Sequence, residues 1–193
     1  MSGFAGRRIW IIGASAGIGE ALARALAAQG ARLVLSARTH QALLALAAEC
    51  AGAGVLPVDL AADGSLAQAV AALKGQPAFD AIICTAALYE PTRVADMDPA
   101  RAEAIVRTNL LGAVDVARLC PPILRNGGQL VLFGSVAGYF GLPGGQPYSA
   151  TKAAVNNLAE SLRVELAPRV DVRLVCPGFV RTRLTDKNNF PMP

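Results

Sequence analysis

The sequence contains few charged or aromatic residues, which make up 17% and 5% of its 193 positions, and it has a single histidine, His40. A lone histidine argues against a Ser-His-Asp hydrolase and against a zinc site built from cysteine and histidine. There is no Cys-x-x-Cys pair, and three of the cysteines sit in apolar segments, as small core residues do. The four cysteines are Cys50, Cys84, Cys120 and Cys176. We therefore expect no metal site.

Long apolar runs are also absent, since none reaches the roughly 18 residues that a membrane span needs. The first strand-like run, Ile9–Ile12, begins too early to leave room for a signal peptide. The 18 basic residues are scattered and form no block of the kind that binds nucleic acid. These absences predict a cytoplasmic protein that binds neither membranes nor nucleic acid. The net charge of +4 could attract a phosphorylated ligand, or could reflect only an arginine-rich surface.

Hydrophobic residues make up 53% of the chain, enough for a large core, and strand and helix patterns alternate along it. The predicted strands are Arg8–Ile12, Arg32–Ser36, Gly54–Val58, Phe79–Cys84, Gln129–Phe133 and Asp171–Val175. The predicted helices are Gly17–Gln29, His40–Cys50, one that is capped by Asp63 and ends at Leu73, one that follows Asp98 from Pro99 to about Leu124, and about Gln146–Ala167. Continuous apolar strands are typical of a parallel sheet covered by helices. The pattern predicts a three-layer α/β domain with a doubly wound parallel sheet, the Rossmann fold.

A glycine-rich turn joins the first predicted strand to the first predicted helix, with the sequence Gly13-Ala14-Ser15-Ala16-Gly17-Ile18-Gly19. Glycine lets the backbone turn tightly and approach a pyrophosphate, and the helix N-terminus supplies free N–H groups. A turn without a ligand is the alternative, but a strand before it and a helix after it are the context of a dinucleotide site. The spacing resembles the Gly-x-x-x-Gly-x-Gly turn of the short-chain dehydrogenases/reductases.

The residues after the second strand indicate which cofactor is bound. An NAD site usually has an acidic residue there, but this strand is followed by Ala37, Arg38 and Thr39. Arg38 could pair with a ribose 2′-phosphate, assisted by Ser15 and Thr39, or could simply be a solvated arginine. By resemblance to the family, Arg38 selects NADP(H) over NAD(H). Asp59-Leu60 resembles the family's adenine-contacting pair, although Asp59 could also be a turn residue.

The candidate reaction centre begins with Tyr148 and Lys152, which are four positions apart and so share one helix face. A nearby cation favours the phenolate and would lower the tyrosine pKa, so that Tyr148 could act as general acid or base. Ser135 follows the fifth strand, at the carboxyl edge where such sheets bind ligands. Asn109 lies inside a predicted helix, and alone it fits a polar residue that bonds to the backbone.

Together these four residues match the catalytic tetrad of the short-chain dehydrogenases/reductases in type, order and approximate spacing. The resemblance covers essentially the whole chain and implies hydride transfer between a nicotinamide and a carbonyl or secondary alcohol. It implies that Tyr148 donates or accepts the proton and that Lys152 lowers its pKa and binds the nicotinamide ribose. It also implies that Ser135 orients the substrate oxygen and that Asn109 holds a water linking Lys152 to solvent.

The segment after the sixth strand matches the family's nicotinamide-contacting segment, and it contributes Pro177, Gly178, Val180 and Thr182. One departure from the family is Cys84-Thr85-Ala86-Ala87, which stands where Asn-Asn-Ala-Gly is common. Thr85 could still bond across the sheet, and the small alanines still leave room beside the cofactor, so we expect Ala86 to contact it.

The end of the sequence is a second departure. After Val175 a polar stretch runs to Pro193, where a further strand and helix would be expected. We therefore expect residues 1–193 to form a single NAD(P)-binding domain that is C-terminally incomplete or has a shortened edge. The family's substrate lid normally follows Thr182. The alternative to an active enzyme is therefore a cofactor-binding sensor or subunit with little turnover.

Two predicted helices, at about 99–124 and 146–167, are apolar over much of their circumference, so each is either deeply buried or packed on a partner. By resemblance, they pair between subunits of a homodimer or homotetramer. The expected substrate is a small carbonyl or alcohol compound. An apolar rim for it, or ordinary loop packing, is suggested by Tyr139, Phe140, Leu142 and Pro143.

Overall fold

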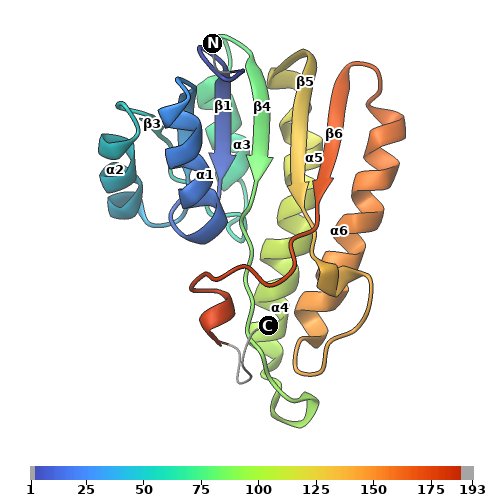
Figure 1. Cartoon of the computed structure of the whole chain (residues 1–193). Coiled ribbons are helices and arrows are strands. Elements are labelled where there is room, and N and C mark those ends of the chain that lie inside the picture. The colour runs from blue at the N-terminus through green and yellow to red at the C-terminus, as the bar shows by residue number, and fades with distance from the viewer. Residues whose placement is uncertain (1–2, 188–193) are drawn as a thin grey trace.

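The computed structural model describes residues 3–187, and a six-stranded sheet forms its centre (Figure 1). Every neighbouring pair of strands is parallel, in the order β3-β2-β1-β4-β5-β6. The chain therefore builds one half of the sheet outward from β1 and then returns to build the other from β4. Sheets of this kind bind ligands at the carboxyl ends of the strands where the direction reverses. The strands are β1 Arg8–Ile12, β2 Arg32–Ser36, β3 Gly54–Val55, β4 Phe79–Cys84, β5 Leu124–Phe133 and β6 Val170–Val175.

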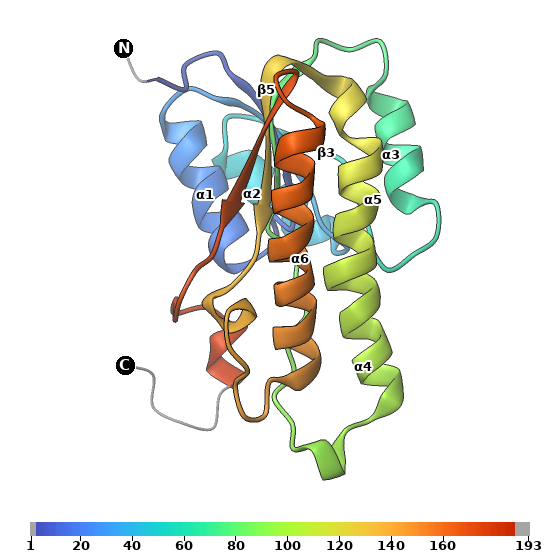
Figure 2. The same ribbon diagram turned by 90° about the vertical axis from the view of Figure 1, so that its right-hand side faces the viewer.

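Helices cover both faces of the sheet, as the apolar strands predicted (Figure 2). One face carries α1 Gly17–Ala28 and α2 His40–Glu49. The opposite face carries α3 Ser65–Leu73, α4 Pro99–Val106, α5 Gly112–Leu119 and α6 Gln146–Glu165. Each face has its own apolar core, one centred on Ile11, Leu35 and Leu43 and the other on Trp10, Ile82 and Val116. The predicted three-layer α/β fold is confirmed. None of the helices within residues 3–187 is long and apolar enough to cross a membrane.

The long helix predicted from Pro99 to about Leu124 is interrupted and ends early. A π-helical turn at Arg107–Leu111 separates α4 from α5, and α5 stops at Leu119. Pro121 and Pro122 explain the early end, because they lack the N–H groups that a further helical turn would use. The start was predicted correctly, since the Asp98 side chain accepts a hydrogen bond of 3.0 Å from the Ala100 N–H.

The third βα unit also differs from its prediction. β3 covers only Gly54–Val55, although Leu56 N and Val58 N beyond it still donate to Leu35 O and Ala37 O of the neighbouring chain segment at 3.0 Å and 3.1 Å. Pro57 stands between these two donors at the free edge of the sheet, where a missing N–H is tolerated. Asp63 does not cap α3. Gly64 holds the capping position with a φ of +76°, and Asp63 instead forms an ion pair with Arg107 at 3.2 Å. Glycine at a left-handed position competes well with an acidic cap, and the sequence pattern does not reveal which of the two adjacent residues is used.

The remaining element ends differ by a few residues. β5 begins at Leu124 rather than Gln129, with a register shift against β4 between Phe79 and Ala81. β6 begins at Val170, one residue early, while α6 ends two residues early at Glu165. Apart from the early start of β5, these are the shifts expected where helix and strand ends fray.

Candidate active site

The glycine turn lies at the reversal point of the sheet, between β1 and α1, where it passes the loop that follows β4. Gly13 has a φ of +97°, and a Cβ added there would lie 2.5 Å from the Ala86 backbone nitrogen. A Cβ on Gly19 would collide with the Gly13 carbonyl oxygen and would lie 2.5 Å from the Thr85 hydroxyl. Only glycine fits at these two positions, since the backbone, and not a movable side chain, occupies the space.

The start of α1 keeps its N–H groups available. Its N-cap is Ala16, in extended conformation, and no side chain caps the helix within the described residues. The first N–H groups of a helix have no partner inside the helix, and together with the helix dipole they attract an anion. The turn therefore offers backbone donors beside open space, as a phosphate group requires.

The residues predicted to bind the adenosine end of a cofactor also meet here. Arg38 and Thr39 follow β2, with exposed side chains, and both line the same cavity as Ser15. Thr39 precedes α2 but makes no capping hydrogen bond, and Arg38 has no recorded ion pair within residues 3–187. Both side chains are therefore available to a ligand.

Asp59 and Leu60 complete this end of the cavity. The Asp59 carboxylate accepts a 2.9 Å hydrogen bond from the Ala61 N–H, so it does form a turn, as the alternative interpretation proposed. Leu60 packs on Gly112 of α5, where an added Cβ would lie 2.8 Å from the Leu60 Cβ. Both residues still line the cavity.

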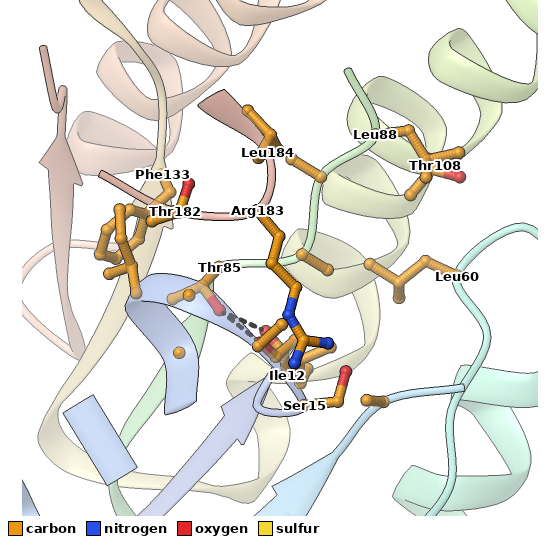
Figure 3. A pocket seen from close by; sticks show the side chains of 18 of the residues that line it. Ile12, Ser15, Leu60, Thr85, Leu88, Thr108, Phe133, Thr182, Arg183 and Leu184 are labelled. Carbon is orange, nitrogen blue, oxygen red and sulfur yellow. Dashed lines mark hydrogen bonds between the residues drawn. The ribbon is translucent and has the colours of Figure 1, made fainter. Parts of the chain in front are cut away.

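The departure at Cys84-Thr85-Ala86-Ala87 is compensated across the sheet, as expected. The Thr85 hydroxyl donates to the carbonyl oxygens of Ile12 and Gly13 at 3.2 Å and 3.1 Å. It thereby links β4 to the glycine turn, and it is labelled in Figure 3 with these two bonds dashed. Ala86 and Ala87 both line the cavity.

Tyr148, Lys152 and Ser135 lie together at the other end of this cavity. Tyr148 and Lys152 stand one turn apart near the start of α6, with the Lys152 ammonium nitrogen 5.6 Å from the Tyr148 ring centroid. Ser135 lies close enough to Tyr148 to act on its pKa. Ser135 follows β5 and accepts a 3.1 Å hydrogen bond from the Ala137 N–H, which starts a short helical turn. The three side chains predicted to carry the chemistry are thus brought together.

Close packing holds the Ser135 loop on α6. A Cβ on Gly138 would lie 2.8 Å from the Lys152 carbonyl carbon and 2.7 Å from the Asn156 amide nitrogen. The loop therefore rests directly on the helix backbone at Lys152. This contact fixes the position of Ser135 relative to Tyr148.

The pKa values of the pair do not follow the expectation from sequence. Burial raises the pKa of Tyr148 above its usual value. Ser135 acts to lower this pKa, whereas Tyr89, whose ring lies 4.9 Å away edge to face, raises it further. The net direction is therefore upward, and the lowering expected from Lys152 stays a prediction. Lys152 is 3% exposed, and its ammonium donates to Phe133 O at 2.7 Å. Desolvation lowers the Lys152 pKa to about 8.

Asn109 lies within the π turn between α4 and α5, and not in the cavity wall. Its side chain is 3% exposed and is held on both sides. Its Oδ1 accepts from Leu88 N at 2.7 Å, while its Nδ2 donates to Leu88 O at 2.8 Å and to the Thr151 hydroxyl at 3.2 Å. Asn109 therefore ties the loop after β4 to α6, next to Tyr148. A π turn often marks a functional site.

The segment after β6 crosses the cavity, and we call residues Pro177–Lys187 the strap. Pro177, Gly178, Val180 and Thr182 all line the cavity, and their contact with a nicotinamide stays a prediction. The Pro177 carbonyl accepts from Val136 N at 3.1 Å, which joins the strap to the Ser135 loop. Thr182 packs on the glycine turn, since its Cγ2 lies 3.3 Å from an added Cβ on Gly17.

The cavity has a volume of about 320 Å³ and joins both ends of the site. Sequence reasoning missed three polar residues in its wall, namely Thr108, Arg183 and Thr185. The Thr108 hydroxyl is buried without a hydrogen-bond partner among the described residues, and Arg183 extends its side chain into the cavity (Figure 3). Thr108 directly precedes Asn109, so its position next to a predicted tetrad residue could have identified it as a residue of the site. For Arg183 the sequence offers none, because its contacts are long-range.

Comparison with known proteins gives a consistent result. The protein family described as short chain dehydrogenase matches residues 7–191. An uncharacterized oxidoreductase of Myxococcus xanthus is 37% identical over 196 residues, which cover 97% of this chain and 77% of that protein. An 11-beta-hydroxysteroid dehydrogenase A of Sesamum indicum is 32% identical over 189 residues, covering 94% of this chain and 54% of that protein.

Solved structures agree. A short-chain dehydrogenase/reductase (glucose/ribitol dehydrogenase) of Brucella melitensis superposes with a TM-score of 0.89 at 29% identity, covering 95% of this chain and 77% of that one. A dehydrogenase/reductase of Sinorhizobium meliloti superposes with a TM-score of 0.85 at 26% identity, covering 93% of this chain and 75% of that one.

Proposed function

The chain belongs to the short-chain dehydrogenase family, and we propose that it is an NADP(H)-preferring oxidoreductase. The reaction is hydride transfer between the nicotinamide and a small carbonyl or secondary alcohol compound, with Tyr148 as general acid or base. The observation that carries this proposal is that Ser135, Tyr148 and Lys152 line the same cavity as the glycine turn.

The residues present fit a nicotinamide dinucleotide. A Cβ at Gly13 would fill the turn, Ala16 leaves the N–H groups of α1 free, and the Thr108 hydroxyl is a buried group in need of a partner. Arg38, with Thr39 and Ser15, would hold a 2′-phosphate, which is why we favour NADP(H). When bound, the cofactor supplies or accepts the hydride. The strap residues Pro177, Gly178, Val180 and Thr182 would hold its nicotinamide end.

The protein's own groups handle the substrate oxygen and the proton. The Ser135 and Tyr148 hydroxyls both reach the space where a carbonyl oxygen would bind, and each can donate a hydrogen bond to it. The raised pKa keeps Tyr148 protonated at neutral pH, which is the form that reduction needs. In reduction, the Tyr148 proton would pass to the substrate oxygen, and the Lys152 ammonium would stabilise the phenolate left behind. Lys152, with a pKa of about 8, can then return a proton.

Asn109 supports this site as a positioning residue. Its amide is bonded to both backbone groups of Leu88 and to the Thr151 hydroxyl. It would therefore hold the loop after β4 at the correct distance from α6. The bound water that the family resemblance implies at Asn109 stays a prediction.

Consumption of NADPH, measured by absorbance with a panel of ketones and aldehydes, tests the proposed function. We expect turnover of at least one carbonyl compound and a lower KM for NADPH than for NADH. Binding of NADPH without turnover of any carbonyl would instead favour a sensor or subunit. Absence of NADPH binding would contradict both.

We also propose a homodimer or homotetramer built on the helices at about 99–124 and 146–167. Figure 2 shows α4, α5 and α6 side by side on one face. Large apolar side chains are exposed on these helices, at Val106 and Val114 and, 81% exposed, at Val164. A monomeric mass in light scattering at micromolar concentration would contradict the proposal. The cytoplasmic location stays a prediction from the sequence.

A further inference from the structure

We propose that Arg183 binds the diphosphate of the cofactor and thereby fastens the strap across the active site. The inference rests on the proposed function, since it names a further binding residue of the same site. It starts from the position of Arg183. The side chain leaves the strap and points into the cavity, toward the glycine turn that carries Ser15 (Figure 3).

The strap is held at both sides of the cavity, so this position is well defined. At its start, Pro177 O accepts from Val136 N at 3.1 Å. In its middle, the Thr185 hydroxyl donates to Val180 O at 2.7 Å and Thr182 packs on Gly17. At its end, the Lys187 ammonium donates to Tyr89 O at 3.1 Å. Arg183 thus projects from a fixed turn that already contacts the phosphate-binding end of α1.

The Arg183 guanidinium has no protein partner within residues 3–187, because no ion pair or side-chain hydrogen bond is formed by it there. Other arginines of the chain do form ion pairs, as Arg24 does with Glu20 and Glu49. Among the described residues that line the cavity, Asp59 is the only acid, whereas Arg38, Lys152 and Arg183 are cations. An unpaired guanidinium in a cationic cavity favours the binding of an anionic ligand. The paired N–H donors of the planar guanidinium match the spacing of phosphate oxygens.

The proposed cofactor carries phosphate at two places, the ribose 2′-phosphate and the diphosphate. The guanidinium groups of Arg38 and Arg183 reach the cavity from different segments of the chain. Arg38 follows β2, where the adenosine ribose would lie. Arg183 comes from the strap, beside Thr182 and Gly17, over the free N–H groups at the start of α1. A diphosphate at that helix N-terminus would therefore be bound from one side by backbone N–H groups and from the other by Arg183.

The test compares Arg183→Gln with Arg181→Gln. Arg181 is also exposed and lies in the strap, but it does not line the cavity, so it is the matched control. The probes are ADP, NADH, NADPH and adenosine, titrated by calorimetry. Loss of a charged hydrogen-bond donor weakens binding by about 10- to 100-fold. We expect this loss for ADP, NADH and NADPH in Arg183→Gln, no loss for adenosine, and wild-type affinities for Arg181→Gln.

Arg183→Lys adds a second variant, which keeps the charge without the fork and should retain part of the affinity. A second measurement follows the strap itself. NADPH should slow tryptic cleavage after Arg181 and Lys187 in the wild-type protein, and this protection should be lost in Arg183→Gln even when NADPH is saturating.

Unchanged affinity of Arg183→Gln for ADP and NADH would overturn the inference, and so would a loss confined to NADPH, which would place Arg183 at the 2′-phosphate. A wild-type protein that binds ADP with the help of Arg183 but reduces no carbonyl would contradict the proposed function while leaving the inference standing. Failure of the wild-type protein to bind ADP would overturn the inference directly.

Discussion

The ammonium nitrogen of Lys152 donates a 2.7 Å hydrogen bond to the carbonyl oxygen of Phe133, the last residue of β5. This bond joins α6, which carries Tyr148, to the strand that leads into Ser135. A carbonyl dipole compensates a buried cation less than a carboxylate does. Desolvation therefore dominates, and the Lys152 pKa falls to about 8 instead of its usual value near 10.4.

This pKa predicts the pH dependence of the reaction. In the proposed mechanism the Lys152 ammonium stabilises the Tyr148 phenolate, and this ammonium is lost as the pH rises through about 8, earlier than for an ordinary lysine. In the reduction direction, kcat/KM for NADPH should be level below this pH and fall by about tenfold per pH unit above it, because kcat/KM reports groups of the free enzyme. Steady-state rates from pH 6 to 10 provide the measurement.

Lys152→Arg serves as the comparison for this prediction. The guanidinium keeps its charge throughout the range, so the fall near pH 8 should disappear even if the absolute rate is lower. Circular dichroism checks that the variant is folded. A wild-type profile that stays level to pH 9.5, or the same fall in Lys152→Arg, would show that Lys152 does not set the profile.

Arg38→Asp should exchange the cofactor preference. The substitution removes the guanidinium that would pair with the 2′-phosphate and adds a carboxylate that repels it, so the ratio of kcat/KM for NADPH to that for NADH should fall by roughly 100-fold or more. Arg32→Asp is the control, because Arg32 is an exposed residue at the opposite end of β2. An unchanged NADPH preference in Arg38→Asp would remove Arg38 from the 2′-phosphate site.

The two acidic residues near helix starts should differ in their effect on stability. Asp98→Ala removes a capping bond of 3.0 Å to Ala100 N and should lower the free energy of unfolding by about 1 kcal/mol. Asp63→Ala breaks only an exposed ion pair with Arg107 and should change it by less than about 0.5 kcal/mol. Urea unfolding of both variants measures the difference. Equal losses would contradict the assignment of Gly64, rather than Asp63, as the cap of α3.

The sequence predicted those parts of the site that local spacing decides. The glycine turn follows from its place between a strand and a helix, and Tyr148 and Lys152 are adjacent because they are one helical turn apart. The cross-sheet bond of Thr85 could also be foreseen, since β1 and β4 end at the same edge of a parallel sheet. All these features depend on elements whose period is written in the residues themselves.

The features that could not be predicted depend on contacts between distant segments. Arg183 enters the cavity because the strap packs on Gly17, more than 160 positions earlier in the numbering. The raised pKa of Tyr148 depends on its burial and on Tyr89, which comes from the loop after β4. The π turn at Asn109 breaks a helix whose apolar pattern continues through it. Such tertiary effects override the local pattern.

Transfer of deuterium from NADPH that carries deuterium at both positions of the nicotinamide C4 tests the central claim, that Tyr148 serves hydride transfer. Mass spectrometry of the alcohol product should show one deuterium on the former carbonyl carbon with the wild-type protein and with Tyr139→Phe, a control at an exposed tyrosine outside the cavity wall. In Tyr148→Phe the rate of labelled product should fall by about 10²- to 10⁴-fold while NADPH still binds. Labelled product formed by Tyr148→Phe at the wild-type rate, or unlabelled product from the wild-type protein, would contradict the account.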